Sequence, residues 1–446
     1  MAGLNLPLHI NNIIYMIWSR YTYLFSKENR FFIYNSLSNC LAEIDEVVFN
    51  LVKEGIKTQQ VETKDIELSE QLCKMKVLVD NDDDEINKIK YINRLRRQNN
   101  RRLILTINPT LACNFNCPYC FESEHPNIYM TDEVEEQIVH YVESCKEAEV
   151  IDVTWFGGEP LLALERIKSL TSKFKKTGLK YSAKMITNGY LLTDNNIKEF
   201  ENLSIKFLQI TIDGMANLHN KRRCLKSGKP TFNTIIKNID NIQSKYPQIG
   251  VSIRVNVDNS NENDFIQLYQ FLSDKHYPNA KVSLAFVKNL SDCKTCANLC
   301  DRNRQAEFVK KVQEKYGIGG SFIYPLPDRT ECAIRNNNAI VIGPQGEVYK
   351  CWNDVGDSSK VIGKIGGKVE NEVLLLRYLV GADPFEDPNC LNCFLLPVCG
   401  GGCPLSRIQK KYDGKEINYC PLIKDNLYDF LLAHINEKEK LKSKTL

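Results

Sequence analysis

The chain has 446 residues, of which 43% are hydrophobic and 25% are charged, the composition of an ordinary globular protein. This length exceeds the about 250–300 residues at which a single hydrophobic core stops growing, so we expect two or three domains. The 58 basic and 55 acidic residues leave a formal charge of +3, too balanced to indicate nucleic acid or a membrane surface as a partner. No run reaches the about 18 apolar residues of a membrane span and no secretion signal is visible, so a cytoplasmic protein is expected.

Residues 1–100 predict a small α+β domain. The aromatic stretch Phe31–Tyr34 is typical of a strand, and a helix is expected over Ala42–Val52. The charged segment Asp82–Arg102 closes this zone and is expected to be a linker helix. The pattern is similar to a winged-helix unit.

Residues 101–320 alternate short β-rich runs with helical stretches, a pattern that predicts a parallel sheet with right-handed crossovers. The expected strands are Leu103–Ile107, Val150–Trp155, Tyr181–Ile186, Ile205–Ile212, Val251–Val257 and Val282–Val287. Thr131 and Thr193 are expected to begin two of the intervening helices. Six such units predict a partial (β/α)6 barrel of the TIM type, with functional residues just after the strands, at their carboxyl ends.

Cysteine is over-represented, with 17 residues, most of them in tight clusters. In a large cytoplasmic chain such clusters favour metal over disulfides. The first cluster follows the first barrel strand and consists of Cys113, Cys117 and Cys120, separated by three and then two residues. Three thiolates on one loop can hold three irons of a four-iron cluster and leave the fourth iron open. A zinc knuckle is the alternative, and His125 is then the only nearby fourth ligand.

This spacing, with an aromatic residue before the last cysteine, resembles the signature of the radical S-adenosylmethionine (SAM) superfamily. Tyr119 occupies the aromatic position. Four further segments match the family in the right order, three of them after later strands and the last on the fifth strand: Gly157-Gly158-Glu159-Pro160, Thr187-Asn188-Gly189, Ile212-Asp213-Gly214 and Arg254-Val-Asn256. The residues that the resemblance implies in SAM binding are Tyr119, Gly157, Gly158, Glu159, Thr187, Asn188, Asp213 and Arg254.

The resemblance also implies a mechanism. The open iron binds the amino and carboxylate groups of SAM, and one electron from the cluster releases a 5′-deoxyadenosyl radical that abstracts a hydrogen atom from the substrate. Glu159 is expected to face the amino group of SAM, and Asn188 its ribose or carboxylate. The two glycines allow the backbone to approach a ligand closely.

Residues 321–446 are rich in Cys, Pro and Gly, and are expected to depend on metal in place of an apolar core before ending in a helix. The cysteines resemble a SPASM domain, which holds two auxiliary iron–sulfur clusters. By this resemblance one cluster is bound by Cys390, Cys393, Cys399 and Cys420, and the other by Cys332, Cys351 and Cys403. Alternatively, one zinc ion could be held by Cys390, Cys393, Cys399 and Cys403.

Three ligands leave one iron of the second auxiliary cluster without a cysteine. Either that iron is open for substrate, or one of Cys293, Cys296 and Cys300 supplies the missing ligand. The same trio could also be a zinc clip or a set of reactive surface thiols. The isolated cysteines are interpreted as small buried hydrophobic residues: Cys40, Cys73, Cys145 and Cys224.

Radical SAM enzymes with SPASM domains mostly act on peptides, so the resemblance implies a maturase that forms a thioether or carbon–carbon cross-link in a ribosomally made precursor peptide. A flavodoxin or ferredoxin is the expected electron donor, and residues 1–100 are similar to leader-peptide-binding extensions. The alternative is formylglycine formation by a sulfatase-maturase-type enzyme. That family carries an aspartate directly after the second SPASM cysteine, whereas Cys351 is followed by Trp352, with Asp354 two residues further on. A non-catalytic zinc or redox-sensing module and an enzyme acting on a small molecule are the remaining alternatives.

Overall fold

The computed structural model describes residues 16–61, 65–120, 122, 125–287, 301–318, 320–325 and 332–445. Its internal contacts divide the chain into two compact units. The N-terminal unit comprises residues 1–95, 325–329 and 384–402, and the barrel unit comprises residues 96–324, 330–383 and 403–446, each as far as it is described. Cys293, Cys296 and Cys300 lie outside the described residues.

The N-terminal unit contains a three-stranded antiparallel sheet in the order β2-β3-β4 and a short pair of strands, β1 and β5. Its strands are β1 (Ile17–Trp18), β2 (Thr22–Lys27), β3 (Arg30–Asn35), β4 (Cys40–Ile44) and β5 (Leu78–Val79). Its helices are α1 (Glu46–Thr58), α2 (Ile66–Lys74), α3 (Asp82–Arg97), α12 (Pro388–Leu391) and α13 (Leu396–Cys399). The expected strand and linker helix are confirmed. The expected helix Ala42–Val52 begins later, because Asp45 caps α1 by accepting a hydrogen bond from the Val48 amide.

Residues 384–402, which belong to the cysteine-rich part of the sequence, pack within the N-terminal unit. The ring of Phe394 lies 6.1 Å from that of Tyr23 and 5.9 Å from that of Tyr34, centroid to centroid. The Ser36 hydroxyl donates a 2.5 Å hydrogen bond to the Phe394 carbonyl. The turn between β3 and β4 therefore holds the chain next to Cys393.

The barrel unit is built on a nine-stranded sheet in the order β11-β10-β9-β8-β7-β6-β12-β13-β14. Its strands are β6 (Arg102–Ile107), β7 (Val150–Trp155), β8 (Lys180–Thr187), β9 (Ile205–Thr211), β10 (Gly250–Val257), β11 (Ala280–Phe286), β12 (Ala339–Ile342), β13 (Glu347–Tyr349) and β14 (Gly363–Lys364). The six strands from β6 to β11 pair in parallel with their neighbours, which confirms the predicted partial barrel.

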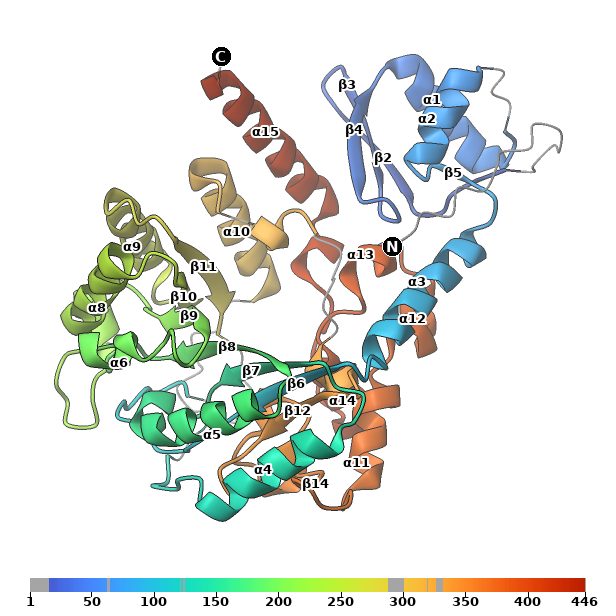
Figure 1. Cartoon of the computed structure of the whole chain (residues 1–446). Helices are drawn as coiled ribbons and strands as arrows, with labels where there is room; N and C mark the ends of the chain where they lie inside the picture. The colour runs from blue at the N-terminus through green and yellow to red at the C-terminus, as the bar shows by residue number, and fades with distance from the viewer. Residues whose placement is uncertain are drawn as a thin grey trace. The chain divides into compact units, whose positions relative to one another are not determined.

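Helices α4, α5, α8 and α9 lie on the outer side of this curved sheet (Figure 1). The helices of the unit are α4 (Asp132–Ser144), α5 (Leu164–Lys176), α6 (Asp194–Lys198), α7 (Ala216–Arg222), α8 (Phe232–Lys245), α9 (Glu262–Asp274), α10 (Arg302–Tyr316), α11 (Glu372–Leu376), α14 (Pro404–Asp413) and α15 (Leu427–Thr445). Thr131 and Thr193 cap α4 and α6 with their hydroxyl oxygens, as predicted. One face of the sheet is apolar and buried, since β8 and β10 alternate buried residues with more exposed, mostly polar ones. Leu105, Trp155 and Ile210 have no exposed surface.

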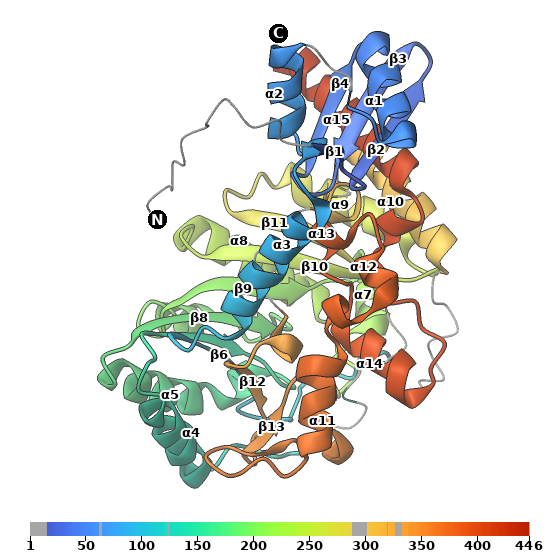
Figure 2. The ribbon, with the colours of Figure 1, turned by 90° about the vertical axis from the view of Figure 1, so that its right-hand side faces the viewer.

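The cysteine-rich zone contributes to this core. The strand β12 pairs in parallel with β6, and β13 continues the sheet in antiparallel fashion (Figure 2). All four residues of Ala339–Ile342 are buried. The expectation that this zone lacks an apolar core is therefore wrong for β12 and β13, because β12 lies between β6 and β13 and both strands contribute residues to the core of the barrel unit.

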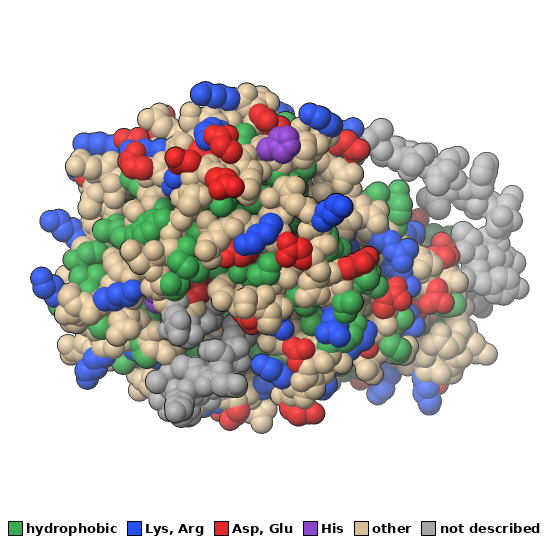
Figure 3. All heavy atoms as spheres, turned by 90° about the horizontal axis from the view of Figure 1, so that it is seen from below, with side chains coloured by type: hydrophobic (Ala, Val, Ile, Leu, Met, Phe, Trp, Pro, Cys, Tyr) green, Lys and Arg blue, Asp and Glu red, His purple; other side chains and the backbone are tan. Residues whose placement is uncertain are grey.

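No helix among the described residues is long and apolar enough to span a membrane. On the face shown in Figure 3, acidic and basic side chains are interspersed, as the balanced composition leads one to expect.

Candidate active site

The cysteine loop that follows β6 carries Cys113, Cys117 and Cys120, all half-buried. The Phe115 amide donates to Sγ of Cys113 at 3.4 Å, and the Cys120 amide donates to the Cys117 carbonyl at 3.2 Å, which folds the loop into a tight turn. Burial raises the pKa of Cys113 to about 12 and that of Cys120 to about 12. Burying a thiolate here requires a positive partner such as a metal centre. Among the described residues no three His, Cys, Asp or Glu side chains are already placed to hold one metal ion, so the assignment of these three cysteines to an iron–sulfur cluster stays a prediction.

The loop is held by two glycines that follow β7. A Cβ atom on Gly157 would lie 2.4 Å from the Thr110 carbonyl oxygen, and one on Gly158 would lie 2.3 Å from that of Ala112. The amide of Gly158 donates to Thr110 O at 3.2 Å, and the amide of Glu159 donates to Ala112 O at 2.9 Å. The close approach that requires glycine is thus made to the backbone of the cysteine loop itself, rather than to a ligand.

Glu159 is fully buried at the end of the same segment. Its carboxylate accepts hydrogen bonds from the amides of Leu161 (3.1 Å) and Asn188 (2.8 Å) and from the Thr187 hydroxyl (2.7 Å). Burial raises the pKa of Glu159 to about 6, although these hydrogen bonds oppose the shift. A carboxylate offers about four acceptor sites, so one is left for a further donor such as an ammonium group.

Asn188 joins the end of β8 to the cysteine loop. Its Nδ2 donates to Oδ1 of Asn114 at 2.7 Å and lies 4.0 Å from Sγ of Cys113. The segments predicted after β6, β7 and β8 therefore meet around one sulfur ligand, as expected for the carboxyl ends of neighbouring parallel strands.

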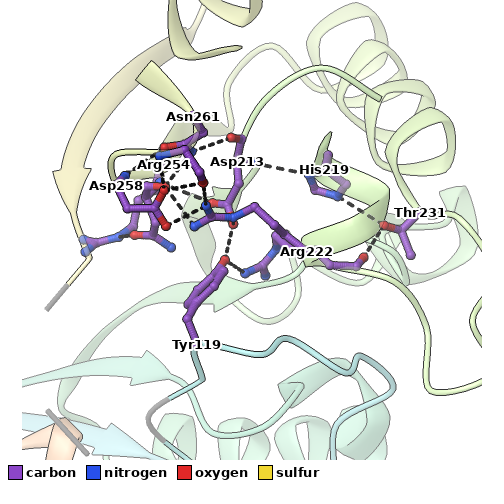
Figure 4. Close-up of polar contacts among 11 residues, drawn as sticks. Tyr119, Asp213, His219, Arg222, Thr231, Arg254, Asp258 and Asn261 are labelled. Atoms are coloured by element: carbon purple, nitrogen blue, oxygen red, sulfur yellow. Dashed lines mark hydrogen bonds and ion pairs between the residues drawn. The ribbon is translucent and has the colours of Figure 1, made fainter. Parts of the chain in front are cut away.

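Tyr119 connects the cysteine loop to the end of β9 (Figure 4). Its hydroxyl donates to Oδ2 of Asp213 and accepts a 2.6 Å hydrogen bond from Nη1 of Arg223. The guanidinium of Arg222 lies over the tyrosine ring, 4.9 Å from its centroid. The aromatic position of the cysteine motif thus serves as an anchor between the loop and a buried polar network.

Asp213 stands at the centre of this network and has no exposed surface. Besides Tyr119, it accepts a 3.3 Å hydrogen bond at Oδ1 from the Asn256 amide and pairs at Oδ2 with Nε of Arg222 at 3.4 Å. Nη1 of Arg222 also pairs with Asp258 at 2.8 Å. Asp213, predicted to bind the cofactor, is in this structure a charge partner that orders the residues around the cysteine loop.

Arg254, the last of the predicted SAM-binding residues, lies on β10 in the same network (Figure 4). Its Nε donates to Oδ1 of Asn256 at 2.9 Å, and burial lowers its pKa. The assignment of Arg254 to SAM binding stays a prediction.

His219 on α7 is hydrogen-bonded to the backbone of Asp213. Its Nδ1 accepts a 3.3 Å hydrogen bond from the Asp213 amide, and its Nε2 lies 3.1 Å from Oγ1 of Thr231. The Thr231 hydroxyl donates its proton to the Arg223 carbonyl at 2.6 Å, so the hydroxyl oxygen accepts a hydrogen bond from Nε2–H of His219. Because Nδ1 of His219 accepts a hydrogen bond and Nε2 donates one, the imidazole is neutral. Burial, aided by the charges of Arg223 and Arg222, lowers the pKa of His219 to about 3.

Sequence reasoning missed Arg222, Arg223, His219 and Asp258. The two adjacent arginines, the last residue of α7 and the one after it, were a visible signal. A sequence does not distinguish a buried arginine from an exposed one, and only the fold brings this pair to the cysteine loop.

Cys224 is not an isolated buried residue. It is half-exposed, its carbonyl accepts a 3.0 Å hydrogen bond from the Asn116 amide, and Leu225 forms an antiparallel bridge with Phe115. Cys224 therefore lies beside the cysteine loop, and the interpretation of it as a core residue is corrected. Cys40, Cys73 and Cys145 are partly buried, and Cys73 and Cys145 pack against the hydrophobic cores as interpreted.

Cys332, Cys351 and Cys403 all belong to the barrel unit, and each immediately precedes a helical turn. Burial raises the pKa of Cys351 well above its usual value, and the nearby thiols of Cys332 and Cys403 raise it further. Beside them Lys350 is buried, and its Nζ donates to the carbonyls of Asn336 and Ala339, both at 2.6 Å. Burial lowers the pKa of Lys350 to about 7, and the charge of Cys332 opposes this shift. The assignment of the three thiols to one iron–sulfur cluster stays a prediction.

Cys390, Cys393 and Cys399 belong to the N-terminal unit, and Cys420 belongs to the barrel unit. The Gly401 amide donates to Sγ of Cys399 at 3.2 Å, which suits a sulfur that is to carry negative charge as a metal ligand. The assignment of these four cysteines to one cluster stays a prediction.

Comparisons with known proteins agree with this geometry. The radical SAM superfamily model matches residues 107–272. A serine-type anaerobic sulfatase-maturating enzyme of Bacteroides thetaiotaomicron is 26% identical over 363 residues, 71% of this chain and 86% of that protein. The radical SAM cyclopropyl synthase TigE of Paramaledivibacter caminithermalis is 24% identical over 366 residues, 74% of this chain and 72% of that protein.

Two solved structures share the fold. Native anSMEcpe with bound AdoMet and Kp18Cys peptide superposes with a TM-score of 0.60 at 19% identity, covering 77% of this chain and 99% of that chain. Streptococcus suis SuiB bound to precursor peptide SuiA superposes with a TM-score of 0.53 at 14% identity, covering 91% and 99%. The chain is therefore an enzyme with a radical SAM domain over residues 107–272 and a SPASM-like cysteine-rich region, and SAM and an iron–sulfur cluster are the cofactors of the radical SAM superfamily.

Proposed function

We propose that this enzyme is a peptide maturase, which removes hydrogen from one side chain of a ribosomally made precursor peptide and closes an intramolecular thioether or carbon–carbon cross-link. The observation that carries the proposal is the three-stranded sheet of the N-terminal unit. Among the described residues its outer strands, β2 and β4, pair only with β3. A sheet of this kind can bind an extended peptide as an additional strand at its edge.

The turn that ends this sheet supports the proposal. Oδ1 of Asn35 accepts hydrogen bonds from the amides of Leu37 (2.9 Å) and Ser38 (3.1 Å), which fixes the turn between β3 and β4. Ser36 in that turn donates to the carbonyl of Phe394. A leader peptide paired with β4 would thus bind to a strand whose preceding turn contacts Phe394, the residue after Cys393, within the same unit.

The residues described above have separate tasks in this proposal. Cys113, Cys117 and Cys120 would hold the cluster, and Glu159 and Asn188 would orient SAM beside it. The bound cofactors supply a 5′-deoxyadenosyl radical. Closing the cross-link removes two hydrogens from the peptide: one leaves as an atom to that radical, and the other leaves as a proton and an electron.

The auxiliary clusters would accept that electron or bind the substrate. Cys332, Cys351 and Cys403 would hold one of them, and the other would be held by Cys390, Cys393, Cys399 and Cys420. A flavodoxin or ferredoxin would supply the electron that initiates each turnover.

The proposal is tested by tandem mass spectrometry of a short peptide encoded beside this gene and co-expressed anaerobically with the enzyme. We expect a mass loss of two hydrogens, with fragmentation blocked between the two linked residues. The Cys113→Ala variant, which lacks one cluster ligand, should leave the peptide unchanged. A peptide unchanged by the wild-type enzyme as well would contradict its assignment as the substrate.

Formylglycine formation is the second candidate, and the similarity to a sulfatase-maturating enzyme favours it. Asp354 is the nearest carboxylate after Cys351, but it is buried and accepts a 2.6 Å hydrogen bond from the Tyr378 hydroxyl. Burial raises the pKa of Asp354 to about 6. An oxidation confined to one serine or cysteine, with an uninterrupted fragment ladder, would establish this reaction in place of cross-linking.

A further inference from the structure

Trp352 is a large aromatic side chain that is exposed beside the candidate active site. It is 46% exposed, whereas Trp18 and Trp155, the other two tryptophans of the chain, are 2% and 0% exposed. The ring of Trp352 lies 6.2 Å from that of Phe156, centroid to centroid, with the two planes tilted by 44°. An exposed apolar residue alone is common on protein surfaces, so the surroundings of this aromatic pair decide what it can do.

Phe156 lies on the inner face of the barrel sheet, at the carboxyl end of β7. Its amide donates to the Ile107 carbonyl at 3.0 Å, so it continues the pairing of β6 with β7 by one residue. Successive residues of a strand point to opposite faces, and Trp155 packs in the core that it shares with the outer helices α4 and α5 (Figure 1). The next residue, Gly157, begins the segment that contacts the backbone of the cysteine loop. The aromatic pair therefore adjoins that segment on the inner side of the barrel.

The turn that carries Trp352 is fixed by its neighbours. The Val355 amide donates to the Trp352 carbonyl at 3.4 Å, which closes the helical turn after Cys351. Tyr349 and Val355 are buried in a small hydrophobic cluster with Leu111, which leads into the cysteine loop. All of these residues belong to the barrel unit. The backbone of Trp352 is thus held in place while its ring stays exposed, where the segments after β6, β7 and β13 meet.

We propose that Trp352 and Phe156 form a subsite that binds an apolar or aromatic side chain of the substrate peptide, next to the residue from which hydrogen is removed. This subsite rests on the proposed function, because it takes a peptide as the substrate. Functional residues of parallel barrels lie at the carboxyl ends of the strands, where this pair is found. Aromatic rings bury a large apolar area and have few rotatable bonds, so they bind a side chain at a small cost in conformational entropy.

The chemistry of the indole ring limits what Trp352 can contribute. Its Nε1–H donates a hydrogen bond and the ring has no proton acceptor, so Trp352 does not remove a proton from the substrate. Neither ring of the pair carries a charge. The subsite therefore recognises its ligand by contact area, and its loss should weaken peptide binding and leave SAM binding unchanged.

The test is isothermal titration calorimetry of the full-length, anaerobically reconstituted enzyme with the peptide encoded beside its gene. SAM is present and reductant is omitted, so that binding is measured without turnover. Trp352→Ala should raise the Kd of the peptide about ten-fold, an effect typical of a central aromatic contact. Trp352→Phe keeps an aromatic ring and should stay within about three-fold of the wild type. Tyr428→Ala removes an aromatic side chain of similar exposure, 39%, from α15 and should keep the wild-type Kd.

Alanine substitutions in the peptide identify the bound side chain. One apolar or aromatic residue of the peptide should cost about ten-fold in Kd when it is replaced by alanine and tested with the wild-type enzyme. The same replacement should cost less than about two-fold with Trp352→Ala, because the two changes remove one interaction. Trp352→Gln takes the place of Trp352→Ala in both measurements if the alanine variant does not fold.

Three results would overturn the subsite. One is a wild-type Kd for the peptide in Trp352→Ala, and another is a set of peptide substitutions that cost equally with both enzymes. The third is a weaker affinity for SAM with an unchanged affinity for the peptide, in which case the indole ring stacks on adenine.

The same measurements separate the subsite from the proposed function. A peptide that binds with the expected dependence on Trp352 but is not cross-linked would contradict the proposed function alone. A peptide that is cross-linked by the wild type, and bound equally well by Trp352→Ala, would contradict the subsite alone. No binding of the peptide to the wild-type enzyme would contradict both.

Discussion

Gly158→Ala should abolish SAM cleavage, although the substitution adds a single methyl group. The new Cβ would lie 2.3 Å from the Ala112 carbonyl oxygen and 2.5 Å from that of Leu111. Both are backbone atoms of the segment that leads into Cys113, so they can yield only if the cysteine loop moves. Overpacking of this severity costs about 3 kcal/mol or more.

The variant should therefore contain about four fewer irons per chain and form no 5′-deoxyadenosine. Iron analysis of the anaerobically reconstituted protein and chromatography of the SAM products measure both effects. Gly367→Ala is the control, because its Cβ would come no closer than 3.2 Å to another atom, Lys364 O. A Gly158→Ala enzyme with full iron content and activity would contradict the packing of the glycine segment against the loop.

The stability of the enzyme should fall below neutral pH because of His219. Its pKa is lowered to about 3 in the folded protein by burial and by the charges of Arg223 and Arg222, against 6.5 when unfolded. The unfolded chain therefore binds a proton that the folded chain excludes. This contribution is fully present above pH 6.5 and is lost as the pH falls from 6.5 towards 3.

Between pH 7 and pH 5 the loss from this one group should be about 2 kcal/mol. The measurement is the free energy of unfolding by urea, under anaerobic conditions, of the wild type and of His219→Gln at both pH values. The glutamine variant should lose about 2 kcal/mol less than the wild type over this range. His140→Gln, on the exposed face of α4, should retain the wild-type difference. Equal losses in the wild type and His219→Gln would show that the imidazole is not held neutral.

Much of the barrel followed from local patterns. Alternating apolar runs and helix caps were sufficient for the six parallel strands and for the starts of α4 and α6 at Thr131 and Thr193. These features depend on neighbouring residues, so they are visible in a sequence. The cysteine loop and the segments after β7 and β8 follow from the same order of strands.

The remaining features depend on contacts between residues distant in the sequence. The strand β12 is four residues long and joins the barrel sheet by pairing with β6, more than 230 positions earlier. Phe394 joins the N-terminal unit through aromatic rings and one hydrogen bond from Ser36, which no local pattern indicates. Gly157 and Gly158 correctly predicted that the backbone approaches another group closely, but that group is the backbone of the cysteine loop rather than a ligand.

The buried arginines illustrate the limit most clearly. Arg222 and Arg223 would be expected on the surface by composition, since arginine is rarely buried unless paired. Their partners lie after β9 and β10 for Arg222, and on the cysteine loop for Arg223. Only the fold places these together.

The most direct test of the account is transfer of deuterium from the peptide. The enzyme is supplied with SAM, a reductant and the peptide encoded beside its gene, deuterated on carbon, and the mass of the 5′-deoxyadenosine formed is measured. We expect a gain of one deuterium in 5′-deoxyadenosine together with a peptide that has lost two hydrogens. Unlabelled 5′-deoxyadenosine formed beside an unmodified peptide would contradict the claim that this radical SAM enzyme acts on that peptide.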